Sequence, residues 1–350
     1  MKRWKKITLW LSALVFVGTA TFCYPTVWGK PWSVNHFYAR VFIGFMLDHP
    51  MVLSQMRLLE PMGLDFHNDD LDDFSIEGQR EQRAQVEADL DTLHAYDRAS
   101  LDDQLSYDVL EWFLADLAAQ ARFGFHNYPV NQMSGFQSTL PDFMINTHRI
   151  DDLDGAENYL ARIAGFEKAF ADTLEGLAFR EELGVIPPKF VITRVLKEMR
   201  AFVAMPVREH VLYTHFSGKL DGLEGLDAAT KTQLQDQLAQ LLEDTVYPAY
   251  ASMIAHYAAL EPTASSDDGV WKLPDGEAYY AAQLRSFTTT EMSAEDIHQL
   301  GLSEVARIQG EMKSILQAQG YDASDFAGTM QALNREPRFL YPDSDEGREQ

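Results

Sequence analysis

The residues with the clearest chemical potential are histidines near the middle of the chain, in Glu209-His210 and at His215. A zinc hydrolase built on a helix needs His-Glu-x-x-His, because this spacing puts two imidazoles on one face, one turn apart. The sequence has no such motif. His210 and His215 are five residues apart, and five helical residues separate two side chains by roughly 140° around the axis. The spacing therefore predicts surface or loop histidines rather than a metal pair.

Nucleophilic chemistry has no better support. The chain lacks Gly-x-Ser-x-Gly, and Met-Ser134-Gly-Phe lacks the first glycine of that motif. Cys23 is the only cysteine and lies in an apolar segment at the N-terminus, so the body of the chain has no disulfide, thiolate metal site or cysteine nucleophile. The sequence thus predicts no metal site and leaves the catalytic residues unknown.

Polar residues at odds with an apolar setting occur near residue 285. Arg285 stands between Leu284 and Phe287 and precedes three threonines. A guanidinium in that setting either ties down loop carbonyls or holds a ligand carboxylate, and the first role is the simpler one. The candidates for lining a substrate cleft are Tyr280, Arg285, Thr288, Thr289 and Thr290.

The elements around these candidates are helical. Tyr280 to Phe287 follow helical spacing, and the threonines interrupt the helix because β-branched hydroxyl residues offer the backbone competing hydrogen bonds. Ser293, with Asp296 three residues on, predicts the capped start of a long helix. Apolar residues at helical spacing predict one buried stripe on that helix: Ile297, Gly301, Val305, Ile308, Met312 and Ile315.

The rest of the chain predicts a mainly α fold of long antiparallel helices. Residues 227–260 predict a long helix that bends at Tyr247-Pro248, where a backbone hydrogen bond is lost. Residues 126–144 predict an ordered loop, and only residues 270–272 are compatible with a strand. A helix after Asp103 is expected to bury a wide stripe: Leu105, Val109, Trp112, Phe113 and Leu117. The last ten residues predict the opening of another helix at Ser344, so the chain looks truncated.

The N-terminus predicts export. A basic start precedes an apolar core, Ile7–Val17, and Gly18-Thr-Ala20 offers the small residues of a cleavage site. Without cleavage, the uncharged span Ile7–Tyr24 is just long enough to cross a bilayer. Residues 1–24 are therefore a signal peptide or a membrane anchor, and residues 25–350 a helical, periplasmic domain, either anchored by residues 7–24 or released near Ala20. Lipid attachment at Cys23 is disfavoured, because Phe22 is bulky where a small residue is needed.

Composition and net charge exclude some classes of binding partner. The chain has 350 residues, of which 46% are hydrophobic, and this apolar content is ample for a packed core. Its net charge is −24. Removing residues 1–24, which hold four cations and no acid, lowers that charge further. A body this acidic repels phosphate backbones and anionic lipid headgroups. We therefore expect no nucleic-acid partner and no basic membrane patch.

Several segments resemble the bacterial family called domain of unknown function 885. The resemblance is carried by the region from Leu273-Pro-Asp-Gly to Met312, and by Leu105-Ser-Tyr-Asp, Tyr128-Pro-Val-Asn-Gln, Glu157-Asn-Tyr-Leu-Ala-Arg-Ile and Gly184-Val-Ile-Pro-Pro-Lys-Phe-Val. The matching segments cover about residues 35 to 350. The resemblance implies a helical, zinc-metallopeptidase-like architecture whose members continue further and place a metal motif, His-Glu followed by Pro-Gly-His, in that continuation. This sequence has no Pro-Gly-His, so the resemblance implies no cofactor for these residues and zinc only for a full-length relative.

Two hypotheses follow. In the first, the chain is the N-terminal helical part of an exported zinc-peptidase-like hydrolase with a peptide or small-molecule substrate, and a missing C-terminal half docks on it. In the second, the chain is a non-catalytic helical envelope protein that binds peptides or protein partners. The first predicts a large exposed apolar face, and the second predicts none.

Overall fold

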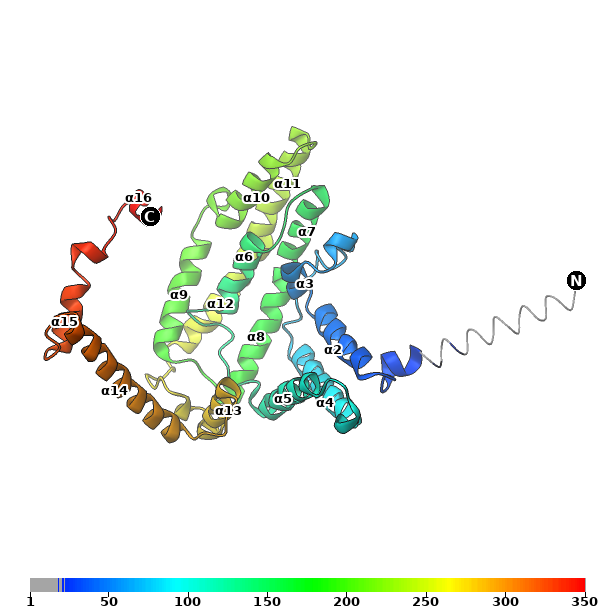
Figure 1. Ribbon diagram of the computed structural model, residues 1–350. Coiled ribbons are helices and arrows are strands. Elements are labelled where there is room, and N and C mark those ends of the chain that lie inside the picture. The colour runs from blue at the N-terminus through cyan, green and yellow to red at the C-terminus, as the bar shows by residue number, and fades with distance from the viewer. Residues whose placement is uncertain (1–17, 19–20, 22, 350) are drawn as a thin grey trace, which may run out of the picture. The chain divides into compact units, whose positions relative to one another are not determined.

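The computed structural model describes residues 18, 21 and 23–349, and every regular element among them is a helix (Figure 1). The chain forms two compact units, Met1–Tyr279 and Tyr280–Gln350. The predicted mainly α fold is confirmed. Most of the predicted span Ile7–Tyr24 lies outside the described residues. None of the described helices is both long enough and apolar enough to cross a membrane.

The larger core of the first unit is a bundle of long helices that lie side by side (Figure 1). Helix α12 packs against both α8 and α9, and α11 packs against α7 and α10. Aromatic side chains such as Tyr159, Phe166 and Phe216 are fully buried between the helices and supply much of the apolar surface that stabilises the fold. The helices are α6 (Phe136–Asn146), α7 (Leu153–Ala164), α8 (Phe166–Glu182), α9 (Lys189–Val203), α10 (Val211–Gly222), α11 (Ala228–Leu241) and α12 (Tyr247–Leu260).

The long helical segment predicted for residues 227–260 is interrupted next to its proline, as expected. Helices α11 and α12 are joined by a π-helical turn, Leu242–Val246, that ends just before Tyr247-Pro248. Proline has no N–H to donate to the preceding turn, and a wider turn at that point accommodates the missing bond.

The loop predicted for residues 126–144 is shorter than expected, because α6 begins at Phe136 and includes Pro141. Proline inside a helix leaves the carbonyl four residues earlier without its usual partner, and here that carbonyl belongs to Gln137. The buried Tyr250 hydroxyl of α12 donates a hydrogen bond to it. A tertiary contact therefore stabilises a helix that the local sequence disfavours.

A smaller core forms between α2 (Val34–Asp48), α4 (Ile76–His94) and α5 (Gln104–Gln120), with α3 (Pro50–Met56) beside them. It is centred on Phe37, Leu93, Tyr107 and Leu114. The sequence placed the buried stripe of α5 on the wrong face. Helix α5 is apolar on more than one side, and the side that meets α4 carries Tyr107 and Leu114, not the predicted stripe.

Short 3₁₀ turns join the helices: η1 (Glu60–Met62), η2 (Arg98–Ser100), η3 (Ala121–Phe123), η4 (Val207–Glu209), η6 (Val270–Lys272) and η7 (Pro337–Phe339). The strand considered for residues 270–272 is therefore wrong. The N–H of Leu273 bonds to the carbonyl of Val270, which closes a turn, and the described part of the chain offers no strand for pairing.

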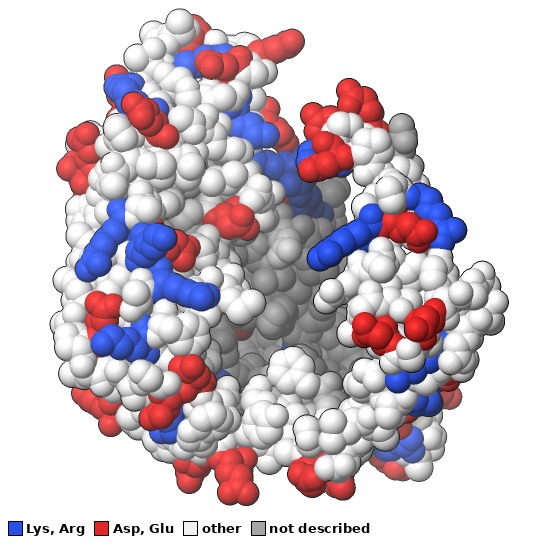
Figure 2. Space-filling model, turned by 90° about the vertical axis from the view of Figure 1, so that its left-hand side faces the viewer, with Lys and Arg blue, Asp and Glu red and all other residues white. Residues whose placement is uncertain are grey.

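The second unit takes up most of α13 (Gly276–Thr288), followed by α14 (Ala294–Ala318), α15 (Phe326–Leu333) and α16 (Asp345–Glu349). The helix predicted after Ser344 is confirmed, since the Ser344 hydroxyl accepts a hydrogen bond from the Gly347 N–H. The stripe of α14, however, is not buried: Val305, Ile308 and Ile315 are 45–63% exposed. Two other members of the stripe, Ile297 and Met312, are half-buried. On the face drawn in Figure 2, acidic and basic side chains are interspersed.

The predicted cap of α14 is present as a complete capping box. The Ser293 hydroxyl accepts from the Asp296 N–H at 3.1 Å, and the Asp296 carboxylate accepts from the Ser293 N–H. We expect Ser293→Ala to destabilise the first turn of α14 by about 1 kcal/mol, because it leaves helix N–H groups without an acceptor. Hydrogen exchange of the amides of Glu295 and Asp296 measures this. Ser303→Ala, on the exposed middle of the same helix, serves as the control and should leave those amides unchanged.

Candidate functional site

Three of the five predicted cleft residues, Arg285, Thr288 and Thr290, make polar contacts at the end of α13. The guanidinium of Arg285 pairs with the Glu291 carboxylate at 2.7 Å. The Thr288 hydroxyl donates to the carbonyl of Leu284 at 2.7 Å and contacts the Thr290 hydroxyl at 2.9 Å.

The other two predicted cleft residues have different settings. Thr289 has a left-handed backbone with φ of 54°, an uncommon conformation for a β-branched residue. Tyr280 lies about two turns earlier on the same helix, is 47% exposed, and takes no part in these bonds. The polar groups of Arg285, Thr288 and Thr290 thus lie at the end of α13, where Arg285 pairs with a carboxylate of the following loop rather than with loop carbonyls. Their role in lining a cleft stays a prediction.

The histidines do not form a metal site. His210 is fully buried and so is not a surface histidine, but it lies in the bend between η4 and α10, which agrees with the loop alternative of the prediction. Its Nδ1 accepts from the Leu212 N–H at 3.3 Å, and its ring packs against Phe202, 4.4 Å between centroids. His215 is half-buried on α10. Among the described residues, no three His, Cys, Asp or Glu side chains are grouped so that they could hold a metal.

The most strongly bonded polar side chain of the first unit is Arg162 of α7, which is 1% exposed. Its guanidinium donates to the carbonyls of Asp70 and His67, both at 2.9 Å, and to the Ser54 hydroxyl at 2.6 Å. It also donates to Nδ1 of His148 at 2.8 Å. Because Nε2 of His148 lies 2.9 Å from the Gly155 carbonyl, that nitrogen carries the ring proton.

Arg162 therefore has a structural role. Burial lowers its pKa to about 10, and the nearby acids Asp69, Asp70 and Asp72 act in the opposite direction, so the side chain is a cation at neutral pH. It joins α7 to α3 and to the acidic loop at residues 67–73. The loop is therefore fastened to the core at its backbone, while the side chains of Asp69, Asp70 and Asp73 are exposed.

A different feature has the shape of a binding site. A groove of about 1490 Å³ lies between α2, α4 and α5, a volume above the ~300–1,000 Å³ of typical small-molecule sites. Its most exposed wall is the face of α5 that the sequence predicted to be buried: Leu105, Val109, Phe113 and Leu117, 39–73% exposed. We call this set the α5 stripe. Phe42 and Phe45 of α2 also line the groove.

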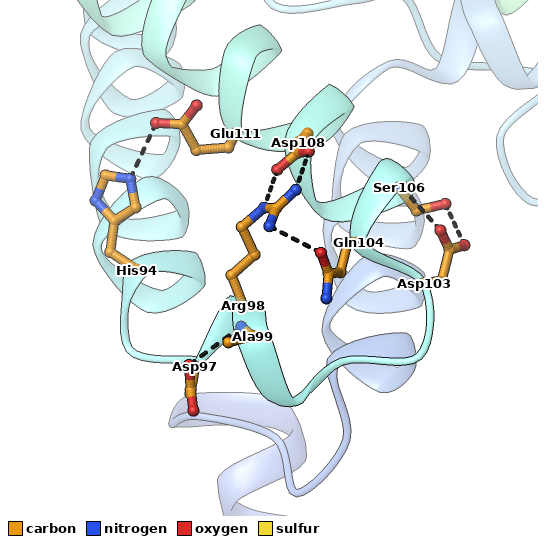
Figure 3. A network of polar contacts seen from close by, with 9 residues as sticks. All are labelled: His94, Asp97, Arg98, Ala99, Asp103, Gln104, Ser106, Asp108 and Glu111. Atoms are coloured by element: carbon orange, nitrogen blue, oxygen red, sulfur yellow. Dashed lines mark hydrogen bonds and ion pairs between the residues drawn. The ribbon is translucent and has the colours of Figure 1, made fainter.

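Polar contacts fix α5 against α4 at the turn that joins them (Figure 3). Arg98 makes two hydrogen bonds of 2.5 Å to the Asp108 carboxylate and one of 2.9 Å to Gln104. His94 of α4 pairs with Glu111 of α5 at 3.3 Å. These groups are exposed, so each pair contributes little to stability, but together they set the register in which the α5 stripe faces the groove.

The groove also contains residues that the sequence did not single out. Arg83 lines it from the charged helix α4. The sequence of α5 does contain a signal for the groove, because this helix has apolar residues on two faces. A helix that packs against one neighbour buries only one such face and leaves the other exposed. The position of Arg83 depends on the packing of Gly124 and Phe125, far along the chain, and no local pattern encodes it.

Comparisons with known proteins agree with this architecture. The structure is similar to a "putative lipoprotein" from Colwellia psychrerythraea, with a TM-score of 0.74 and 27% identity over 87% of this chain and 55% of that protein. It also shares its fold with a "putative lipoprotein of unknown function" from Shewanella oneidensis, with a TM-score of 0.58 and 16% identity over 82% of this chain and 48% of the other.

The chain spans about half the length of these two proteins. No curated protein matches it. The family model described as "Bacterial protein of unknown function (DUF885)" matches residues 59–350. By this match over most of its length, the chain belongs to the DUF885 family.

Proposed function

We propose that this chain is the helical N-terminal part of an exported, zinc-peptidase-like hydrolase. The observation that carries the proposal is the exposed apolar stripe of α14, where Val305, Ile308 and Ile315 face solvent at helical spacing. A contiguous exposed apolar face on a folded protein marks a surface that another element covers. The chain spans only about half of its structural relatives, so the C-terminal half of a longer protein is the occupant proposed here.

Zinc does not fit the described residues, which contain no group of three ligands. The proposal therefore assigns the zinc ligands to the C-terminal half and gives this chain a supporting role. The helices of this chain hold one side of a substrate cleft, with Tyr280, Arg285 and Thr288–Thr290 as its candidate lining. Export is supported by the basic, apolar N-terminus and by the names of the two structural relatives.

A second function, a non-catalytic helical envelope protein that binds peptides or protein partners, is favoured by one observation. The groove between α2, α4 and α5 is larger than a typical small-molecule site and has an exposed apolar wall, the kind of surface that a peptide or protein partner covers. The two functions differ in what they expect of α14: only the first requires its stripe to be covered by a C-terminal half.

The test starts from the nucleotide sequence downstream of Gln350. We expect an open reading frame that continues, and a complete product that holds stoichiometric zinc by inductively coupled plasma mass spectrometry and cleaves peptides. This chain alone should show neither property. If the frame closes directly after Gln350, or if the complete product binds no zinc, the first function is wrong.

A matched pair of variants tests the docking surface. Ile308→Glu places a charge on the α14 stripe and should weaken association of this chain with the separately produced C-terminal part by at least about tenfold, since a buried unpaired carboxylate is costly. Ser314→Glu adds the same charge to the same helix away from the stripe and should have no effect. Equal association of both variants contradicts the assignment of α14.

A further inference from the structure

The cations that line the groove between α2, α4 and α5 differ in their partners. Arg40 pairs with Asp89 at 3.6 Å and donates to the Gly29 carbonyl at 2.5 Å. Lys30 donates to the Ala95 carbonyl at 2.6 Å. Among the described residues of the lining, Arg83 is the cation with no oxygen partner.

The setting of Arg83 makes this absence costly. Its guanidinium lies against Gly124, where a Cβ would come within 2.1 Å of Nη2, and 4.4 Å from the centre of the Phe125 ring. It is partly buried, and burial together with the nearby Arg80 lowers its pKa. A cation that is partly removed from water, in a chain with a net charge of −24, is expected to have a counter-charge.

A second arginine close to Arg83 also lacks a carboxylate partner. Arg180 of α8 lies 5.1 Å from the same Phe125 ring. Its nitrogens donate to neutral groups: the Asn127 side-chain oxygen at 2.8 Å and the Gly176 carbonyl at 2.9 Å. Its pKa is lowered to about 10, chiefly by burial and also by Arg83. Two guanidinium groups thus lie close to one ring with no carboxylate paired to either. One of them, Arg83, lines the groove, which makes this end of the groove attractive to an anion.

The rest of the groove is suited to an apolar chain. The α5 stripe runs from Leu105 to Leu117, which at the rise of an α-helix is a length of about 18 Å. Its members become less exposed from Leu105, at 73%, to Leu117, at 39%, so the groove is more enclosed towards Gln120, Ala121 and Gly124, which also line it. The remaining acid of the lining, Asp48, is exposed on α2.

From this juxtaposition we propose that the groove binds a long-chain fatty acid, with its acyl chain along the α5 stripe and its carboxylate on Arg83. This ligand joins a long apolar chain and a single anion in one molecule, as the lining does. An apolar peptide helix laid in the same groove would cover Arg83 without neutralising it, which is unfavourable. The inference is independent of the proposed hydrolase, because it involves only α2, α4 and α5.

The test measures binding of parinaric acid, a fatty acid that fluoresces in apolar surroundings, to the full chain. We expect saturable binding that palmitate displaces. Arg83→Gln should weaken binding of the acid by about 10- to 100-fold, the value of a hydrogen bond to a charged group. The same variant should leave binding of the methyl ester of parinaric acid unchanged.

Two further variants complete the design. Val109→Glu puts a carboxylate on the exposed α5 stripe and should abolish binding of both acid and ester. Arg80→Gln removes an exposed arginine of the same helix, paired with Glu77 at 3.7 Å, and should change neither. Circular dichroism verifies that every variant is folded. The proposal is overturned if parinaric acid binds equally well to wild type and Arg83→Gln, or if the groove takes an amphipathic peptide and shows no saturable binding of the acid.

Discussion

Replacing Arg162 by methionine is expected to lower the free energy of unfolding by about 3–4 kcal/mol, the largest effect of any single substitution considered for this chain. Methionine fills much of the same volume but donates no hydrogen bond. The carbonyls of His67 and Asp70, the Ser54 hydroxyl and Nδ1 of His148 would lose the donor they share. Buried acceptors without partners account for the cost.

The loss should be spread over elements that are distant in sequence. Arg162 lies 108 residues from Ser54 and 92 from Asp70, so its bonds fasten α3 and the acidic loop to α7. We expect hydrogen exchange in residues 64–75 to accelerate in Arg162→Met before α8 or α12 responds. Arg162→Lys keeps the charge but offers one ammonium in place of a planar guanidinium, and should recover only part of the stability.

Urea denaturation followed by circular dichroism measures the change. Arg194→Met is the matched control, because Arg194 is an exposed arginine of α9 whose guanidinium lies over the Phe190 ring at 5.7 Å. It should cost less than about 0.5 kcal/mol, as for surface substitutions in general. A loss below about 1 kcal/mol in Arg162→Met would show that water or neighbouring groups replace the guanidinium.

Sequence patterns predicted where helices begin and end better than they predicted which face of a helix is buried. The Ser293 cap, the interruption before Pro248 and the helix after Ser344 follow from local chemistry, and the structure contains all three. The buried stripes predicted for α5 and α14 are exposed instead. A helical apolar pattern shows that a face needs a partner, but not whether the described chain supplies it.

The site was less predictable for a related reason. The threonines and Arg285 were identified because their residue types conflict with their surroundings, and their contacts turned out to be local. Arg83 and Arg162 depend on groups brought from far along the chain: Phe125 for the first, Ser54 and His67 for the second. No alternation or spacing encodes such contacts, so local patterns cannot distinguish these two arginines from ordinary surface charges.

The second large effect is an expected loss of folding stability at acidic pH. His148 and His210 are buried, and burial, the main cause for both, lowers the pKa of each from 6.5 to about 4. In the unfolded chain these rings bind protons near pH 6.5, whereas in the folded protein they stay neutral until about pH 4. Between these values the unfolded state binds more protons, so stability rises with pH and is lost as pH falls.

The size of the acid effect follows from the shifts. One pKa unit corresponds to about 1.4 kcal/mol, so each histidine contributes on the order of 2–3 kcal/mol to the loss between pH 6.5 and 4. Two such groups would remove a large part of the roughly 5–15 kcal/mol that stabilises a typical domain. Carboxylates such as Asp73, whose pKa is lowered from 3.8 mainly by a hydrogen bond from the Ser75 backbone, contribute only at still lower pH.

Unfolding free energies at pH 7, 5.5 and 4.5 of wild type and His210→Asn separate the two histidines. Asparagine keeps a side-chain acceptor for the Leu212 N–H, so the variant loses ring packing against Phe202 and Tyr247 but retains the cap of α10. It should be less stable than wild type at pH 7 and lose about half as much stability on acidification, because one of the two histidines whose pKa is lowered to about 4 is gone and His148 remains. His298→Asn, at an exposed position of α14, should parallel wild type at every pH. A variant His210→Asn with the full wild-type slope would mean that His210 is already protonated, or free to become so, in the folded protein, and that the acid response arises elsewhere.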